Sequence, residues 1–246
     1  MASRLIELNM TNRVNISWVR ILAEGSAILV SILLAFGIQA WWEERQERAA
    51  ETELLSRLHA EFLTNLARID ERTFYLSVLL QGEELFAQIK EARKDGQETI
   101  NTSGLTLRWF TYAPTFEADT PILDGLLRGG RLEIIEDRNV QSVLATWERE
   151  LRDYTAFAER ARRNADELLL PALYRRGDIG DILMVSRSAN NSNDPALEVP
   201  VQIRVDDELK GIVAGRYAAG RSAQSKFEVL RSAAIKVVDV IEPHLP

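Results

Sequence analysis

The stretch ILAEGSAILVSILLAFGIQAWW, residues 21–42, is an apolar run of helix length with charged residues on both sides. An α-helix needs about 20 apolar residues to cross the roughly 30 Å hydrocarbon core of a bilayer. Glu24 is the only charged residue within the run, and Trp41 and Trp42 close it where indole rings favour the headgroup region. The pattern predicts an uncleaved transmembrane helix over 21–42, preceded by a short tail, 1–20.

A cleaved signal peptide and a buried core helix are the two alternatives for this run. A signal peptide has a shorter apolar region and small residues before its cleavage site, and Ile38 fits that site poorly if cleavage follows Ala40. A core helix of a soluble domain rarely carries so long an uncharged run. Both alternatives are therefore weaker than a membrane anchor.

Two further features of the run concern its polar and small residues. Arg20 and Glu24 are four residues apart and so predict an ion pair on one helix face at the membrane edge; a proton relay through Glu24 is the alternative. A ridge of small residues ending in a glutamine predicts self-association or packing on a partner membrane helix, because small residues let helix backbones approach closely. The members of this ridge are Ala23, Ala27, Ser31, Ala35 and Gln39.

The arginines near the run are almost evenly divided between its two flanks. Arg20 lies closest to the membrane on the N-terminal side, while the other flank is rich in glutamate. Because cytoplasmic flanks carry an excess of basic residues, we expect the N-terminus inside and the large domain outside the cytoplasm. The bilayer itself is thus the first expected partner.

Residues 43–246 are numerous enough for one domain with a real core. The formal net charge of −7 argues against a nucleic-acid surface. Apolar residues recur at three- and four-residue spacing, which predicts an all-α fold: a soluble antiparallel helical bundle with coiled-coil-like packing. The expected helices are a long one over 43–94, a short one over 121–128, a long one over 137–170 and a C-terminal one over 207–241.

Local signals set several of these boundaries. Asp119-Thr120-Pro121 is typical of a helix cap with proline in the first turn, and Asp137 is a second capping candidate. Pro171 is expected to end the helix that begins there. Residues 199–205 have strand character, but without a partner strand we expect an extended loop.

The sequence contains no recognisable catalytic or metal-binding pattern. The two histidines, His59 and His244, are far apart, and neither belongs to a Glu-x-x-His pair. A G-x-S-x-G turn is also missing. We therefore expect no metal, no cofactor and no enzymatic activity.

Aromatic residues are the best candidates for ligand binding. Together with a nearby arginine they form the expected lining of a pocket for an anionic ligand, and the alternative is that they belong to the bundle core. The candidates are Trp109, Tyr112, Phe116, Trp147, Arg149 and Tyr154.

Two segments, Glu24–Gln46 and Leu126–Val140, resemble the sequence pattern of a widespread group of uncharacterised bacterial membrane proteins. That pattern is a glutamate, an apolar span, a tryptophan, a Glu/Arg run and a long helix. The resemblance implies a single-pass protein of the bacterial plasma (inner) membrane whose helical domain has no established activity.

These features predict a membrane-anchored, non-enzymatic helical module that acts by binding, either as a sensor-like domain or as a scaffold, and that forms a homo-oligomer. The alternative is an accessory subunit of an envelope or transport complex, with Glu24 contacting another membrane helix.

Overall fold

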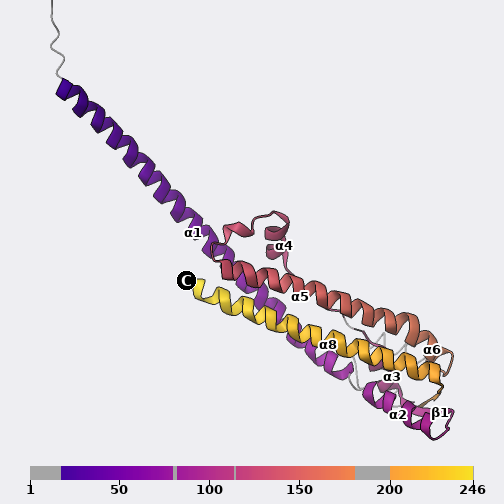
Figure 1. Ribbon diagram of the computed structural model, residues 1–246. Helices are drawn as coiled ribbons and strands as arrows, with labels where there is room; N and C mark the ends of the chain where they lie inside the picture. The colour runs from indigo at the N-terminus through magenta and orange to yellow at the C-terminus, as the bar shows by residue number, and fades with distance from the viewer. Residues whose placement is uncertain (1–17, 80–81, 114, 181–199, 246) are drawn as a thin grey trace, which may run out of the picture. The chain divides into compact units, whose positions relative to one another are not determined.

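The computed structural model describes residues 18–79, 82–113, 115–180 and 200–245 (Figure 1). The chain divides into two compact units, residues 1–51 and 52–246. Their described residues are mostly helical, with one two-stranded sheet in the second unit. The all-α prediction is therefore confirmed in outline, and the sheet is an addition to it.

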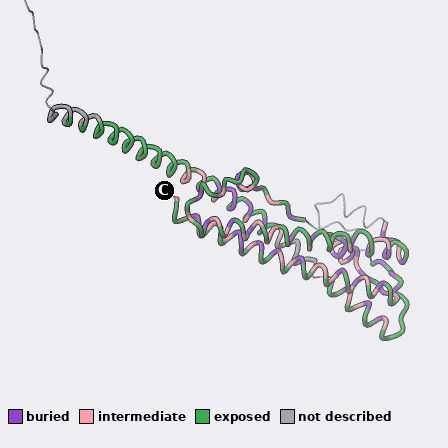
Figure 2. The backbone as a smooth tube through the Cα atoms, turned by 45° about the horizontal axis from the view of Figure 1, so that its top comes forward, coloured by how far each residue is buried: buried purple, intermediate pink, exposed green. Residues whose placement is uncertain are grey.

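The first unit contains the beginning of helix α1, which runs over Trp18–Leu79. From Leu29 to Ala50 every side chain is exposed, as the continuous green of this segment in Figure 2 shows. Among the described residues, no helix is both long enough and apolar enough to cross a membrane. The transmembrane helix predicted over 21–42 thus lacks support here, and several side chains in its first turns lie outside the described set.

The second unit is built around three long helical segments: the part of α1 from Thr52 onwards, α5 (Arg138–Arg163) and α8 (Asp207–Ile241). Helices α5 and α8 lie side by side and run in opposite directions (Figure 1). Short helix α4 (Pro121–Arg128) and the 3-10 turn η1 (Leu132–Ile134) precede α5. This arrangement is the antiparallel helical bundle that the sequence predicts.

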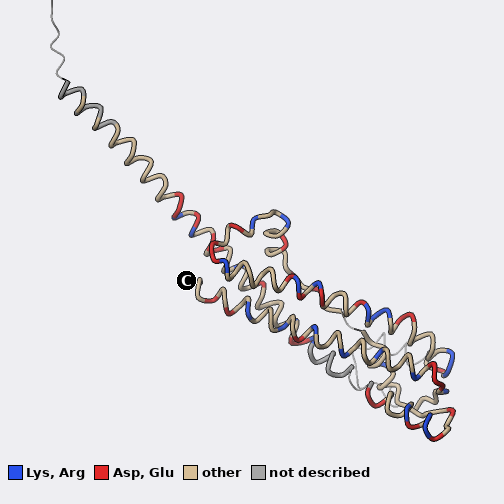
Figure 3. The backbone as a smooth tube through the Cα atoms, viewed as in Figure 1, with Lys and Arg blue, Asp and Glu red and all other residues tan. Residues whose placement is uncertain are grey.

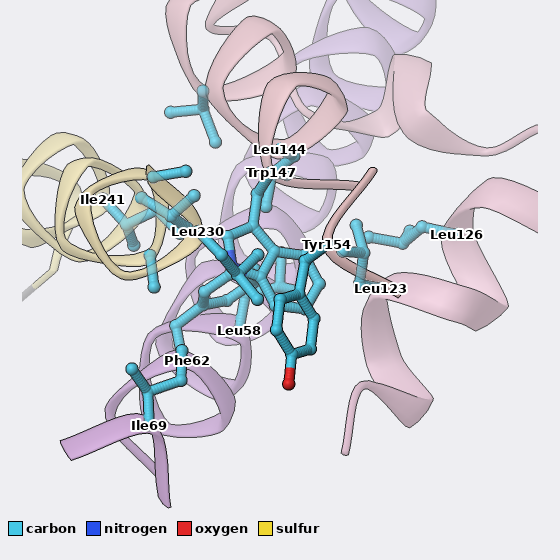
Figure 4. Packing of buried hydrophobic residues seen from close by; sticks show 14 of the residues in the cluster. Leu58, Phe62, Ile69, Leu123, Leu126, Leu144, Trp147, Tyr154, Leu230 and Ile241 are labelled. Carbon is cyan, nitrogen blue, oxygen red and sulfur yellow. The ribbon is translucent and has the colours of Figure 1, made fainter. Parts of the chain in front are cut away.

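The first hydrophobic core lies between these elements (Figure 4). Helix α5 contributes Val140, Leu144 and Trp147, whose spacing of four and three residues places them on one helix face. Helices α1, α4 and α8 contribute other fully or almost fully buried members, including Leu58, Phe62, Ile69, Leu123, Phe227, Leu230 and Ile241. Their burial accounts for the amphipathic pattern of all three long segments.

A second core lies around shorter elements. These are α2 (Gly82–Lys94), β1 (Thr99–Ser103), α3 (Gly104–Thr111), α6 (Leu170–Tyr174) and β2 (Pro200–Arg204). The first turns of α8 complete this core through Leu209 and Val213. Its side chains are mostly aliphatic, whereas the first core is rich in aromatic rings.

The prediction of an extended loop over 199–205 is wrong, because this segment has a partner strand. Strand β2 pairs with β1 in antiparallel register, with Ile100 opposite Ile203. The backbone N–H of Arg204 donates to the Arg176 carbonyl at 2.9 Å, on the side of β2 away from β1. Gly177 lies beside this edge, where a Cβ would come within 2.9 Å of the Gln202 carbonyl oxygen. A side chain there would push the turn away from the strand.

Pro171 does not end the preceding helix, which corrects a second expectation. A π-helical turn, η2 (Asn164–Leu169), joins α5 to α6, and the N–H of Leu170 donates to the Ala165 carbonyl. Pro171 then occupies the first turn of α6, where a missing N–H costs little. The wider π turn shifts the hydrogen-bond register so that the chain stays helical through the proline.

The remaining boundaries lie close to those expected. Helices α4 and α8 occupy 121–128 and 207–241. Asp137 caps α5 by accepting hydrogen bonds from the backbone N–H groups of Asn139 and Val140, which confirms that capping prediction. The long helix expected over 43–94 is described as parts of α1 and α2, with residues 80–81 outside the description.

Candidate functional site

The six residues predicted to bind a ligand occupy two regions of the second unit and a surface position. Phe116, Trp147 and Tyr154 are buried in the first core. The ring of Tyr154 lies 5.0 Å from that of Phe227, and Trp147 lies edge-on to Phe62 at 4.9 Å. These partners, which the sequence did not single out as site residues, make the aromatic group part of the core packing (Figure 4).

The other three predicted residues lie elsewhere. Trp109 and Tyr112 pack edge-to-face at 6.2 Å at the end of α3, and Arg108 lies over the Trp109 ring. Arg149 is on the outside of α5 and pairs with Glu150 at 3.2 Å. Phe116 and Tyr154 thus share Phe227 as a neighbour, and Trp109 packs on Tyr112. The ligand-binding assignment of the six residues stays a prediction.

The buried aromatic residues have little capacity for acid–base chemistry. Burial raises the pKa of the Tyr154 hydroxyl to about 12, so it stays protonated at neutral pH. The indole Nε1 of Trp147 is buried and has no hydrogen-bond partner in the described structure. Neither group is poised to exchange a proton with a substrate.

The buried polar residues of the second unit are more informative than its buried aromatic residues. The first of them is Glu61 of α1. One carboxylate oxygen accepts a hydrogen bond from the backbone N–H of Ile122 at 2.8 Å, and the other accepts from Leu123 at 3.2 Å. Thr120, at the capping position of α4, makes no side-chain capping bond of its own. Glu61 therefore caps α4 from a different helix, and burial raises the pKa of its carboxyl group.

Asn65, one turn further along α1, holds the residue before this cap. Its side-chain oxygen accepts from the Asp119 N–H at 2.9 Å, and its amide nitrogen donates to the Asp119 carbonyl at 2.7 Å. The side chain is fully buried. Asn65 pairs with the Asp119 backbone as a neighbouring strand does, so it fixes both the position and the direction of the chain entering α4.

Arg216 of α8 makes comparable side-chain hydrogen bonds at the end of α3. Its guanidinium group donates to the carbonyl of Phe110 at 3.1 Å and to that of Tyr112 at 2.8 Å, and it lies over the Phe110 ring. The residue is 2 % exposed, and burial lowers the pKa of its guanidinium to about 10. The cation sits at the C-terminus of α3, where the helix dipole is negative.

Arg176 forms a third buried contact, at the end of α6. It donates to both carboxylate oxygens of Asp206 and also pairs with Glu208. Asp206 in turn accepts from the Leu209 N–H and so caps α8. Burial opposes the charge of Asp206, but the Leu209 N–H and the Arg176 guanidinium outweigh it and lower the Asp206 pKa.

Sequence reasoning missed these buried polar residues, although a signal exists. Glu61 and Asn65 fall between Leu58, Phe62 and Ile69 on the apolar stripe of α1. A polar residue at a stripe position must find an internal partner, because an unpaired buried polar group is costly. The stripe identifies the position, but it does not reveal the partner.

In the first unit, the residues of the predicted small-residue ridge are only partly described. The side chains of Ala23, Ala27, Arg20 and Glu24 lie outside the described residues. Ser31, Ala35 and Gln39 are exposed. Gln39 donates to the carboxylate of Glu43 at 2.9 Å within the same helix, so its amide is already engaged.

An apolar hollow lies on another face of this segment of α1. It surrounds Gly37, where an added Cβ would meet nothing within 4 Å. The residues lining the hollow are Val30, Leu33, Leu34, Gly37, Ile38 and Trp41. The hollow is open and contains no polar group suited to catalysis.

Within the described part of the chain, no three His, Asp or Glu side chains gather closely enough to hold a metal ion. Comparison with protein-family models, with curated proteins and with solved structures finds no match to this chain.

Proposed function

We propose that the chain is a membrane-anchored, non-enzymatic helical module that acts by binding. Residues 21–42 are the anchor, and the second unit is the interaction domain on the non-cytoplasmic side of a bacterial plasma membrane. The observation that carries the proposal is the exposed apolar surface of α1 in the first unit.

That surface is extensive and surrounds the helix. Large apolar side chains are at least half exposed at successive positions on all sides of the segment. They are Leu29, Val30, Ile32, Leu33, Leu34, Phe36, Ile38, Trp41 and Trp42. Removing nine such side chains from water is worth on the order of 10 kcal/mol. A helix that is apolar all round is typical of a membrane span or of the core of a large protein.

The charge distribution of the same segment supports an anchor of this kind. In Figure 3 the described part of this segment carries no charged residue up to Trp42, and charged residues are frequent from Glu43 onwards. Ser26 donates its hydroxyl hydrogen to the Leu22 carbonyl at 2.6 Å, so this polar group is satisfied within the helix. Internal satisfaction of polar groups is what a hydrocarbon environment requires.

The proposal of a binding role for the second unit rests on its interior. Its buried charged groups contact backbone amides, backbone carbonyls or more exposed carboxylates, as Glu61, Arg216 and Arg176 show. Such contacts use these three charged groups to position short helices and helix ends. A scaffold that presents surfaces to a partner fits these contacts better than a catalytic site does.

The first test determines the membrane topology by cysteine labelling. The sequence contains no cysteine, so each variant carries a single reactive thiol. Two single-cysteine variants, Ser3→Cys and Ser225→Cys, are expressed at full length and treated in spheroplasts with a membrane-impermeant maleimide. We expect Ser225→Cys to react before lysis and Ser3→Cys only after it. Equal reactivity of the two before lysis would rule out a single crossing.

The second test separates a self-associating scaffold from an accessory subunit. Native purification of the full chain in mild detergent is followed by mass spectrometry of the retained proteins. A homo-oligomer without other subunits supports the scaffold. A stoichiometric partner, lost when Ala27 and Ser31 are replaced by bulky residues, supports the accessory-subunit alternative.

A further inference from the structure

We propose that Arg45, stacked on Trp41, is a binding site for the phosphate of an anionic phospholipid headgroup. This inference rests on the proposed membrane anchor and names the lipid that the anchor recognises. The observations that carry it all lie within the first unit.

Among the residues that the structure describes, the guanidinium group of Arg45 has an aromatic partner and no acidic one. Its central carbon lies 5.7 Å from the centroid of the Trp41 ring, and both side chains are exposed. Within the described residues Arg45 forms no ion pair, because the residues one turn away are Trp41, Trp42, Arg48 and Ala49. Its five N–H donors are therefore available to an external anion.

Three acidic residues of the same segment face another direction. Glu43, Glu47 and Glu51 recur every four residues and so lie along one side of the helix. Arg45 follows Glu43 by two residues, which places it about 200° around the helix axis, on the opposite side. Two acidic side chains near Arg45 also have partners within the helix: Glu43 accepts from Gln39, and Glu44 pairs with Arg48.

This arrangement gives the segment a basic and aromatic side at the boundary between apolar and charged sequence. Trp41 and Trp42 lie with ring centroids 6.5 Å apart, one turn before Arg45 on the helix. Indole rings favour the depth of the lipid headgroups, and a guanidinium fork matches the oxygen geometry of a phosphate. Stacking on Trp41 holds the fork in place without using its N–H donors.

An anionic headgroup fits this site better than a zwitterionic one. A phosphatidylglycerol phosphate presents a net negative charge, whereas the choline of phosphatidylcholine offsets it. One basic side chain near a membrane surface contributes enough for about a fivefold preference for anionic lipid. Arg48 contributes less, because Glu44 already neutralises it.

The test uses tryptophan fluorescence of the full chain in vesicles. Trp18 and Trp109 are replaced by phenylalanine, which leaves Trp41, Trp42 and the fully buried Trp147. The vesicles contain equal amounts of phosphatidylcholine and phosphatidylglycerol, and one of the two lipids carries bromine on its acyl chains. Bromine quenches on contact, so the ratio of quenching reports which lipid surrounds Trp41 and Trp42.

We expect about fivefold preferential quenching by brominated phosphatidylglycerol. Arg45→Gln should bring the ratio close to one, Arg45→Lys should leave it in between, and Arg48→Gln should change it little. Equal quenching by both lipids in the parent protein overturns the headgroup site and leaves the anchor intact. Quenching by neither lipid overturns the anchor itself. If Arg48→Gln matches Arg45→Gln, overall charge rather than the Trp41–Arg45 pair is responsible, and the proposed site is wrong.

Discussion

Helices α3 and α4 have the same length, eight residues, and each is held by a buried charge from a long helix. The two charges are opposite in sign and act at opposite ends. Glu61 of α1 accepts from N–H groups in the first turn of α4. Arg216 of α8 donates to the carbonyl of Phe110 in the last turn of α3 and to that of Tyr112, which follows the helix. In both cases the side chain supplies hydrogen bonds that the helix end lacks and also has the sign that the helix dipole favours.

The comparison shows how a chain can fix two helices that are too short to be stable alone. Isolated helices of this length are marginal in water, so their stability must come from tertiary contacts. The segment between the two contacts is further held by Asn65 through the backbone of Asp119. Four substitutions test this interpretation, from the largest expected effect to the smallest. All are measured as the free energy of unfolding of the full chain in mild detergent.

Arg216→Met should have the largest effect, a loss of about 3 kcal/mol. The substitution preserves an apolar chain of similar length but leaves the Phe110 and Tyr112 carbonyls without their donor. Denaturant titration followed by circular dichroism measures the loss. Arg221→Met, at an exposed position further along α8, is the matched control and should stay within about 0.5 kcal/mol of the parent protein. Equal stabilities of the two variants would refute the role of Arg216.

Asn65→Ala should cost about 2 kcal/mol, because it removes the donor and the acceptor that hold Asp119. Thr64→Ala, at the neighbouring exposed position, is the control for helix propensity. Hydrogen exchange of the backbone amides of α4 provides a second readout. We expect Asn65→Ala to speed hydrogen exchange in α4 more than in α5. Equal acceleration in both helices would argue against a local role of Asn65 in holding α4.

Glu61→Gln should cost about 1 kcal/mol at neutral pH, because the amide keeps one acceptor and loses the other. Its pH dependence is more specific. Burial raises the Glu61 pKa above its ordinary value of 4.5, so the contribution of this group to stability is complete below that pH and declines as pH rises through the raised pKa. The stability difference between the parent protein and Glu61→Gln should therefore be larger at pH 4.5 than at pH 7.

The matched control for this pH dependence is Glu53→Gln, an exposed position on the same helix. Its stability difference should be small at both pH values. A difference for Glu61→Gln that grows as pH rises would contradict the assigned direction of the pKa shift.

Arg231→Gln should have the smallest effect, below about 0.5 kcal/mol. Arg231 and Asp70 form an ion pair at 2.6 Å between α8 and α1, but both side chains are more than 40 % exposed. Solvent screens such a pair, unlike the buried contacts of Arg216 and Glu61. A loss equal to that of Arg216→Met would mean that burial does not distinguish these charges.

Several elements of the fold were predictable because their signals are local. The apolar stripe over Val140, Leu144 and Trp147 indicates a helix, and Asp137 marks where it begins. The same reasoning located α8 from its periodicity. The capping of α4 was only half predictable: Pro121 marks the first turn, but the carboxylate that caps it comes from Glu61, about sixty positions earlier in the sequence.

The sequence identified the aromatic residues but not their packing partners, and their role as a ligand site stays a prediction. Trp109 of α3 packs against Tyr112, the residue that follows this helix, while Phe116 packs against Phe227 of α8. A pocket depends on which helix faces meet, and that information is not present in any single helix. The basic and aromatic side around Arg45 was accessible from spacing alone, but its stacking on Trp41 required side-chain positions.

By itself, the sequence determined the bounds of α4 and α8, the cap at Asp137, the first turn at Pro121, and the change from apolar to charged residues after Trp42. Each of these depends on interactions between residues within a few turns of one another. Only the tertiary structure decided the pairing of β1 with β2 and the partners of Glu61, Asn65 and Arg216. Those contacts join segments far apart in the chain, and hydrogen bonds to backbone groups leave no recognisable residue type at the partner position.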